Sequence, residues 1–263
     1  MREDEGAEQA LAFLRRSEAA TGNRLHLGWG SFRNLDIVAA RQSRWALLMD
    51  INIHQFRVWD AVLAALRMAP SAEEFIELAV ATLPTQPRLR QFVPDTREWL
   101  RADRTRGGSW LAEHAPDRFQ HVSRMAREGR IELACIDMRG GAGANHACPF
   151  ATLSDGMRSA RATGVIPDTL YVSNVAWMLA QPHGFFGEEH GPDSAWRDAR
   201  SNLALLAPHF HHVVCAMSLA AHARPDDLQW ETRVYDPVEF IGEDRWERMA
   251  SEGPRPVASF PSA

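Results

Sequence analysis

The chain has 263 residues and a formal net charge of −5 at pH 7, so its length suits one α/β domain with a sizeable core, and its charge gives no support for a nucleic-acid-binding surface. All 29 basic residues are arginine, which excludes a Schiff-base lysine and the lysine of a phosphate-binding loop. Cys135, Cys148 and Cys215 are odd in number and widely spaced, and we find no signal peptide or membrane-length apolar run, so we expect a cytoplasmic protein without a membrane span.

The chain is expected to open with a helix over residues 5–16, whose buried side carries Leu11, Phe13 and Leu14. The sequence Thr-Gly-Asn at residues 21–23 breaks this helix, so residues 1–21 are interpreted as an N-terminal helical cap. The main domain is expected to span residues 22–254. Residues 255–263, rich in proline and serine, are expected to form a loosely held tail.

A short apolar stretch, Leu25 to Leu27, predicts the first strand, and it runs into a glycine-containing turn that ends near Asn34. A strand, a glycine turn and a helix in this order are typical of a nucleoside-binding loop, because glycine tolerates positive φ and lets a ligand approach the backbone. Only Gly28 and Gly30 fit the dinucleotide-binding fingerprint, since no third glycine follows. By itself the turn is therefore a weak signal.

The apolar run from Trp45 to Met49 predicts a strand inside a parallel sheet, and this run ends on an acid, Asp50. In such sheets ligands bind outside the carboxyl ends of the strands. Asp50 follows Gly30 by 20 residues, which is the spacing expected of a carboxylate that binds a ribose diol. The alternative is that Asp50 only caps the next helix, predicted from its apolar spacing over residues 53–66.

Further helices are predicted over residues 72–83 and 109–128, and Gly129 ends the second of them as a C-cap. The arginine- and proline-rich stretch near residues 84–110 is interpreted as a helical insertion that forms a small lid. Another strand follows over residues 130–136 and ends in Asp137. Such an acid can accept a hydrogen bond from an adenine amino group, or it can merely cap a turn.

After a helix expected over residues 151–162, a strand over residues 170–174 ends on the polar pair Ser173 and Asn174. Asp50, Asp137 and this pair thus follow three predicted strands. The carboxyl ends of parallel strands meet at one edge of a sheet. Random placement would scatter polar residues, so the coincidence predicts a ligand site at that edge.

Histidines in the second half of the chain are weaker candidates for chemistry. His183 and His190 fall in a predicted loop and have a pKa suited to acid–base work, but most surface histidines have no catalytic role. The histidines at residues 209, 211 and 212 are predicted to accompany a strand over residues 210–217, where His209 and His211 share one face. No carboxylate or cysteine stands at ligand spacing beside them, so we expect no metal site. A last strand is expected over residues 228–235.

Four segments carry a resemblance to a known family: L-G-W-G-S-F-R-N at residues 27–34, W-A-L-L-M-D-I-N at 45–52, E-G-R-I-E-L-A-C-I-D-M at 128–138 and L-Y-V-S-N at 170–174. With the alternation of strands and helices over residues 22–222, they resemble a bacterial branch of the class I S-adenosylmethionine-dependent methyltransferases. The resemblance implies an α/β fold with a Rossmann-like, mostly parallel sheet flanked by helices, and S-adenosylmethionine as cosubstrate or substrate. The first loop departs from the family pattern, because Trp29 stands between two glycines and the third glycine is absent.

The residues that the resemblance implies as cofactor-binding lie at the ends of the expected strands: Gly28, Gly30, Asn34, Asp50, Ile51, Asp137, Met138, Ser173 and Asn174. The two glycines would approach the methionine part of the cofactor. Asp50 would bind the ribose, and Asp137 would bind near the adenine. Ser173, Asn174 and Val175 would border the reacting centre.

The simplest activity implied is methyl transfer to a small-molecule acceptor, without nucleic-acid or membrane partners. Ser173 and Asn174 offer a polar orienting pair but no strong base, which favours a nitrogen or already acidic oxygen as acceptor. One alternative is intramolecular cyclisation of S-adenosylmethionine to azetidine-2-carboxylate with release of methylthioadenosine, as in bacterial natural-product enzymes of this fold. In that reaction the aromatic faces of Trp29, Tyr171 and Trp177 would hold the cation, and Asn174 would orient the amine. A second alternative is a protein that senses the cofactor without catalysis.

Overall fold

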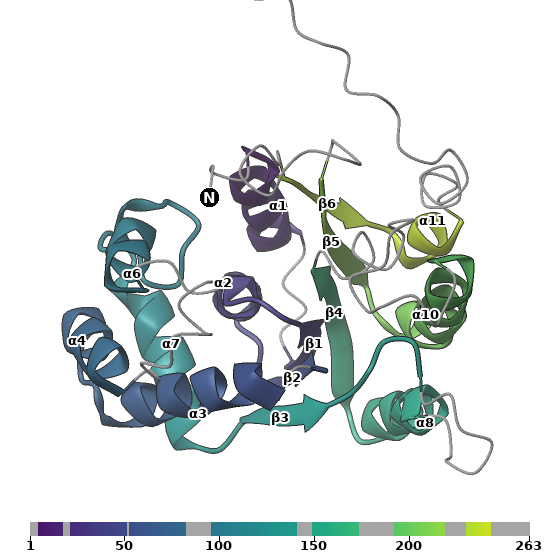
Figure 1. Cartoon of the computed structure of the whole chain (residues 1–263), viewed down its shortest axis with the longest axis horizontal. Coiled ribbons are helices and arrows are strands. Elements are labelled where there is room, and N and C mark those ends of the chain that lie inside the picture. The colour runs from purple at the N-terminus through teal and green to yellow at the C-terminus, as the bar shows by residue number, and fades with distance from the viewer. Residues whose placement is uncertain are drawn as a thin grey trace, which may run out of the picture.

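The computed structural model describes residues 5–17, 22–51, 53–82, 96–140, 149–173, 192–218 and 230–242. Within this part of the chain the strands form one mixed sheet in the order β3-β2-β1-β4-β5-β6. Their bounds are β1 (Asn23–Trp29), β2 (Trp45–Asp50), β3 (Ile131–Cys135), β4 (Val165–Ser173), β5 (His212–Ser218) and β6 (Trp230–Tyr235). The sheet lies at the centre of the molecule, between two layers of helices (Figure 1).

The sheet is parallel except at one edge. Strands β1 to β5 pair in parallel, and β6 runs antiparallel to β5. The chain passes from β1 outward to β2 and β3, and then crosses back to place β4 on the other side of β1. The strand order therefore reverses between β1 and β4, which is the kind of switch point where open α/β sheets bind ligands. The predicted α/β class with a mostly parallel sheet is confirmed, and the topology is compatible with a Rossmann-like fold.

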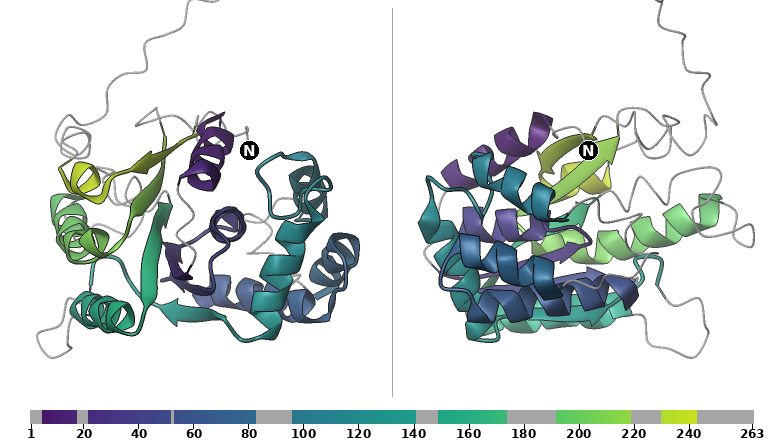
Figure 2. Two further views of the ribbon diagram at one scale, coloured as in Figure 1. Left: turned by 180° about the vertical axis from the view of Figure 1, so that it is seen from behind. Right: turned by 60° about the vertical axis from the view of Figure 1, so that its left-hand side comes forward.

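Helices cover both faces of the sheet. Their bounds are α1 (Glu5–Arg16), α2 (Arg33–Arg41), α3 (Ile53–Met68), α4 (Ala72–Thr82), α6 (Thr96–Thr105), α7 (Pro116–Arg127), α8 (Pro149–Ala162), α10 (Pro192–Leu206) and α11 (Pro237–Ile241), with a short 3-10 helix η1 (Ala207–His209). Helices α8, α10 and α11 lie on one side of the sheet, and α1 to α4, α6 and α7 lie on the other (Figures 1 and 2).

The alternation of side chains along β1 shows how the sheet packs between the two layers of helices. Leu27 and Trp29 point into the apolar core that Phe150 of α8 helps to form. His26 and Gly28 point to the opposite face, toward Asn34 of α2. Successive side chains of a strand alternate between faces, so a sheet covered on both sides needs buried residues at every position. The same requirement explains why β2 is a continuous apolar run in the sequence.

Two helices differ in part from the sequence prediction. Helix α1 has the predicted bounds, but the prediction that Phe13 is buried is wrong, since its side chain is 48% exposed and meets His212 edge-on. Helix α7 begins at Pro116 and not at Ser109. Proline suits the first helical position because the missing N–H has no intrahelical partner there. Trp110, ahead of the helix, is buried in a turn.

No helix was predicted where α10 and α11 lie, and β4 begins at Val165 and not at residue 170. Apart from α7, the other predicted strands and helices lie within two residues of their predicted bounds. The histidine cluster differs from its prediction, because β5 begins at His212 and His209 lies in η1, so the prediction that His209 and His211 share a strand face is wrong. Gly129 follows α7 with a φ of +66°, which confirms its predicted role at the helix end. Of the predicted lid, α6 is described, and residues 83–95 lie outside the described residues, as do residues 243–263 with the predicted tail.

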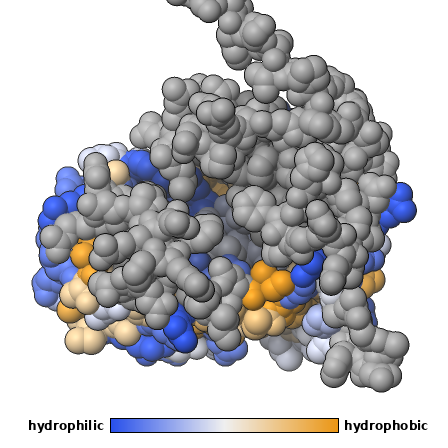
Figure 3. Space-filling model, viewed as in Figure 1, coloured by the Kyte–Doolittle hydropathy of each residue, from blue (hydrophilic) through white to orange (hydrophobic). Residues whose placement is uncertain are grey.

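The described surface is mixed in character. Figure 3 shows hydrophilic and hydrophobic residues side by side wherever the described part of this face is visible. Large apolar side chains that are exposed, such as Met68 on α3 and Val238 on α11, lie on helices at opposite faces of the sheet. Scattered apolar side chains of this kind are ordinary on protein surfaces. Among the helices described here, none is long and apolar enough to cross a membrane.

Candidate functional site

Backbone hydrogen bonds tie together the carboxyl ends of β1, β2 and β3. The Gly30 N–H donates to the Met49 carbonyl at 3.0 Å, and the Ile136 N–H donates to the Asp50 carbonyl at 3.0 Å. On the other side of β1, Gly28 is in register with a residue of β4, Tyr171. The described residues predicted at the strand ends therefore share one edge of the sheet, next to the switch point.

Gly30 is the residue of the turn whose backbone conformation requires glycine. Its φ is +76°, a left-handed value that costs a residue with a side chain roughly 1–2 kcal/mol. A Cβ at this position would lie 3.3 Å from Ser173 Oγ, so the turn approaches the end of β4 closely. Ser173 is 5% exposed and itself has a φ of +55°. Sparsely populated conformations cluster at ligand sites, and here they occur on both sides of the switch point.

Gly28 is required to be glycine by its close neighbours and not by its backbone conformation. A Cβ there would lie 2.0 Å from Asn34 Oδ1 and 3.0 Å from Tyr171 Cβ. Asn34 is fully buried, and its amide nitrogen donates to the carbonyls of Trp29 at 3.3 Å and Ser31 at 2.8 Å. Gly28 and Asn34 were both predicted to contact the cofactor; in the structure the Asn34 side chain fills the space beside Gly28.

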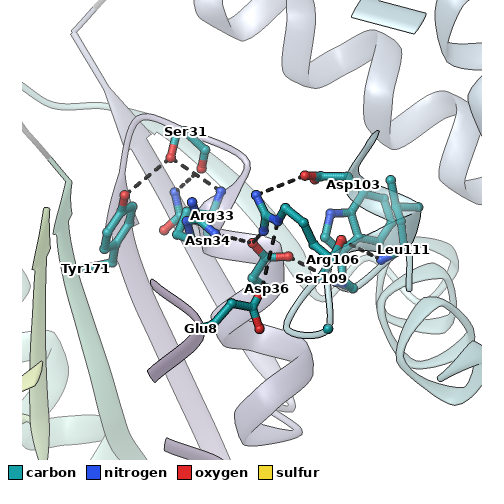
Figure 4. Close-up of polar contacts among 12 residues, drawn as sticks. Glu8, Ser31, Arg33, Asn34, Asp36, Asp103, Arg106, Ser109, Leu111 and Tyr171 are labelled. Atoms are coloured by element: carbon teal, nitrogen blue, oxygen red, sulfur yellow. Dashed lines mark hydrogen bonds and ion pairs between the residues drawn. The ribbon is translucent and has the colours of Figure 1, made fainter. Parts of the chain in front are cut away.

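Tyr171 reaches from β4 across the switch point toward the glycine turn (Figure 4). The residue is 3% exposed, and its hydroxyl lies 3.3 Å from Ser31 Oγ. Burial raises the pKa of Tyr171, although hydrogen bonds with Ser31 and Ser173 act in the opposite direction. The hydroxyl therefore stays protonated at neutral pH, so Tyr171 can orient a ligand by hydrogen bonding but is not a base.

Trp29 lies in the core beneath the turn. It is 2% exposed, and its ring stacks on Phe150 with centroids 5.9 Å apart and planes 10° from parallel. Its indole N–H donates to the Ile136 carbonyl at 3.3 Å. Phe150 therefore covers one face of the ring that was predicted to hold a cation.

The acid predicted to bind the ribose ends β2 in a partly buried position. Asp50 is in register with Cys135 of β3, and the following residue, Ile51, is 39% exposed. The Cys135 thiol lies 3.9 Å from the Ile51 carbonyl. The end of β2 thus combines a carboxylate with solvent access, as a site for a ribose diol requires.

Asp137 binds Arg139, a partner that sequence reasoning missed. The Arg139 guanidinium donates from Nε to both carboxylate oxygens, at 3.0 and 2.9 Å, and from Nη2 to Oδ2 at 2.6 Å. The hydrogen bond to Asp137 raises the pKa of Arg139. Asn202 of α10 supports this turn by donating to the carbonyl of Met138, whose side chain is 2% exposed. An adenine amino group would therefore share the Asp137 oxygens with Arg139.

A buried ion network beside the turn was also missed. Asp36 is 2% exposed and accepts hydrogen bonds from Arg33 at 3.3 Å, from Arg106 at 2.9 Å and from the backbone N–H of Trp110 at 2.9 Å (Figure 4). Arg106 also pairs at 2.9 Å with Asp103, which is 3% exposed. Burial raises the pKa of Asp103 to about 7, the charge of Asp36 adds to this effect, and Arg106 opposes it. The only sequence signal was two pairs of opposite charges three residues apart, Arg33 with Asp36 on α2 and Asp103 with Arg106 across the end of α6.

Several predicted residues lie outside the part of the chain that the structure describes: Asn174, Val175, Trp177, His183 and His190. Among the described residues, no group of three or more His, Cys, Asp or Glu side chains could hold a metal ion. His209, from the histidine cluster, pairs with Ser154 of α8, with 2.7 Å between Nε2 and Oγ.

Comparison with known families is informative for the first third of the chain. A family model described as a domain of unknown function (DUF7790) matches residues 14–85, which include the glycine turn and Asp50. No curated protein matches the chain. Over residues 14–85 the chain is thus similar to a family whose description assigns no activity.

Proposed function

We propose that the chain binds S-adenosylmethionine at the carboxyl edge of the sheet and transfers its methyl group to a small acceptor. The observation that carries this proposal is the position of Gly30 and Asp50 at the ends of adjacent strands, beside the switch point between β1 and β4. Gly30 has a φ of +76°, and Asp50 is partly buried. A turn of this kind beside a carboxylate suits a nucleoside with a ribose diol.

The chemistry of the neighbouring residues fits the other parts of such a ligand. Arg139, held by Asp137 at the end of β3, offers a planar cation of the kind that stacks on aromatic rings such as adenine. Ser31 and Tyr171 bring two hydroxyls to the end of β1, where a polar amino-acid group needs hydrogen-bonding partners. These groups support the proposal because they surround Gly30 and Asp50 along one edge.

The residues at this edge of the sheet are better suited to positioning the reactants than to removing a proton from them. When bound, S-adenosylmethionine supplies a methyl group that is already activated by the sulfonium. The chain then needs mainly to hold donor and acceptor in line. The raised pKa of Tyr171 removes the phenol as a base at neutral pH, so we propose an amine or an already acidic oxygen as acceptor.

The cyclisation alternative gains less support from the described residues. It depends on aromatic faces around the sulfonium, and Trp29 is 2% exposed with Phe150 against its ring. A buried ring of this kind contributes to the core and offers little area to a cation. Methyl transfer is therefore the better-supported reaction, and cyclisation and sensing are outcomes that an assay can separate.

Calorimetry with S-adenosylmethionine tests the binding step. We expect Asp50→Ala to weaken binding by about tenfold to a hundredfold, because charge-assisted hydrogen bonds contribute about 1.5–3 kcal/mol. The matched control is Glu132→Ala, which removes an exposed carboxylate from β3 and should leave affinity unchanged. Wild-type protein that binds no S-adenosylmethionine would refute the proposal.

Product analysis tests the reaction. Incubation with S-adenosylmethionine and a cell extract should yield S-adenosylhomocysteine and a methylated small molecule. Methylthioadenosine formed without any extract would indicate cyclisation. Tight binding with neither product would indicate a sensor.

A further inference from the structure

A buried series of hydrogen bonds connects β4, β1 and α2 directly beside the glycine turn. Thr169, His26 and Asn34 are each 0% exposed. His26 and Thr169 are in register on adjacent strands, with 2.8 Å between His26 Nδ1 and Thr169 Oγ1. On the other side of the ring, His26 Nε2 lies 2.8 Å from Asn34 Oδ1. Since β1 and β4 border the switch point, this series crosses it.

The partners of Asn34 determine the direction of each hydrogen bond. Asn34 Nδ2 lies near the carbonyl oxygens of Trp29 and Ser31, which only accept, so Nδ2 faces them and Oδ1 faces His26. His26 Nε2 must then carry the proton, and Nδ1 accepts from the Thr169 hydroxyl. Burial lowers the pKa of His26 to about 4, so the ring is neutral at pH 7 and keeps one proton.

These contacts hold both sides of Gly30. Trp29 precedes Gly30 and Ser31 follows it, and the Asn34 amide donates to the carbonyls of both. Gly28 leaves the space in which Asn34 lies, since a Cβ on Gly28 would come 2.0 Å from Asn34 Oδ1. The turn is therefore held in shape by the chain itself, and a site ordered in advance binds with a smaller entropic penalty.

We infer that His26 and Asn34 are positioning residues of the ligand site, which hold the turn from Trp29 to Ser31 in the conformation that presents Gly30 at the switch point. The identity of the ligand rests on the proposed function, whereas the positioning is a property of the chain alone. Asn34 then acts on ligand binding through the backbone of the turn.

The ligand-free protein tests the positioning directly. A long-range ¹⁵N–¹H NMR spectrum of the full chain should show His26 as the Nε2–H tautomer from about pH 5.5 to pH 8, since its pKa is about 4. Asn34→Ala should speed hydrogen exchange of the Gly30 amide at least tenfold. The control is Ser123→Ala, which removes a fully buried hydrogen bond to the Leu66 carbonyl on α3 and should leave Gly30 exchange unchanged. The Nδ1–H tautomer, or equal exchange in both variants, would overturn the inference.

If Asn34→Ala does not fold, Thr169→Val carries the same test. It keeps the shape of the side chain and removes only the hydroxyl that donates to His26. We expect it to speed Gly30 exchange about threefold relative to Ser123→Ala, and no difference would contradict the inference.

Calorimetry then separates positioning from general stability. Asn34→Ala should weaken S-adenosylmethionine binding about tenfold, while Ser123→Ala leaves it unchanged even where both variants lower the unfolding temperature. Unchanged affinity in Asn34→Ala, with faster Gly30 exchange, would show that Asn34 supports the turn without affecting ligand binding, and would contradict its role as a positioning residue. If the wild-type protein binds no S-adenosylmethionine, the proposed function fails, and the tautomer and exchange measurements still decide the positioning.

Discussion

The two ends of helix α2 carry buried polar residues that serve different parts of the molecule. At its start, Asn34 supports the glycine turn, and Asp36 binds Arg106 beyond α6. At its end, Arg41 makes a two-bond ion pair with Asp168 at 2.7 and 2.8 Å. A helix of nine residues is about 13 Å long, so the first group lies at the carboxyl edge of the sheet and the second at the amino edge. Burial of a polar residue therefore does not by itself indicate a site; its position relative to the strand ends does.

The amino-edge group should have the largest effect on stability. Arg41→Met leaves the Asp168 carboxylate, 1% exposed, without its two-bond partner, and it also removes hydrogen bonds from Arg41 to Ser17 at the end of α1. Breaking a buried pair by removing one partner costs about 3–5 kcal/mol. Urea denaturation should show this loss in the free energy of unfolding.

A double variant serves as the control. Arg41→Met combined with Asp168→Leu removes both charges, so it should be more stable than Arg41→Met alone. The affinity of the folded protein for its ligand should not change, because both residues lie at the opposite edge of the sheet from Gly30. A loss of less than about 1 kcal/mol in the free energy of unfolding of Arg41→Met would show that the pair contributes little to the stability of the fold.

The ion network at the start of α2 includes Asp103 of α6, and its contribution to stability should depend on pH. Asp103 has its pKa raised to about 7, mainly by burial and next by the charge of Asp36, so the folded state binds this proton more tightly than the unfolded chain does. Its contribution to the free energy of unfolding is therefore fully present below about pH 4 and is lost as the pH rises to about 7. The loss amounts to up to about 4 kcal/mol.

Asp103→Asn tests this dependence. The variant lacks the titrating group, so the difference in unfolding free energy between wild type and variant should fall from pH 4 to pH 8 and then stay level. Other carboxylates are common to both proteins, and the subtraction removes them. A difference that does not vary with pH would show that Asp103 stays ionised in the fold, paired with Arg106.

The elements that carry the candidate site could be predicted because each depends on a local pattern. The apolar run ending in Asp50 forms β2 with that acid at its end.

Helix α1 matched its predicted bounds, yet Phe13 was assigned to the buried face, whereas its side chain is exposed. Residues two apart on a helix point about 200° apart, so Phe13 cannot share a face with Leu11, whereas Leu14 can.

The polar contacts between elements could not be predicted. His26 and Thr169 are separated by 143 residues, and Arg41 and Asp168 by 127 residues. Each pair meets only once the strand order and register are set, and a pattern within one segment contains no information about either. Asn34 was predicted as a ligand contact because it follows the glycine turn, and its role as internal support of that turn became visible only in the fold.

The smallest expected effects distinguish the two glycines of the turn. Gly28→Ala places a Cβ 2.0 Å from Asn34 Oδ1 and must displace that side chain, a kind of overpacking that costs about 1–3 kcal/mol. Gly30→Ala forces a residue with a side chain to a φ of +76°, which costs about 1–2 kcal/mol. Urea denaturation of the two variants measures both losses.

Combining each change with Asn34→Ala shows which glycine depends on Asn34. At Gly28 the shortest contact is with the Asn34 side chain, and Asn34→Ala removes that contact, so the double variant should lose at least about 1 kcal/mol less than the sum of the single losses. At Gly30 the strain lies in the backbone φ and not in a contact with the Asn34 side chain, so Asn34→Ala relieves it only as far as the turn loosens, and a smaller coupling is expected there. Additive losses at Gly28 and Asn34 would mean that the first glycine is not there to accommodate Asn34, and the cost of a Cβ at that position would then come from His26 Nε2 and Tyr171 Cβ, each 3.0 Å away.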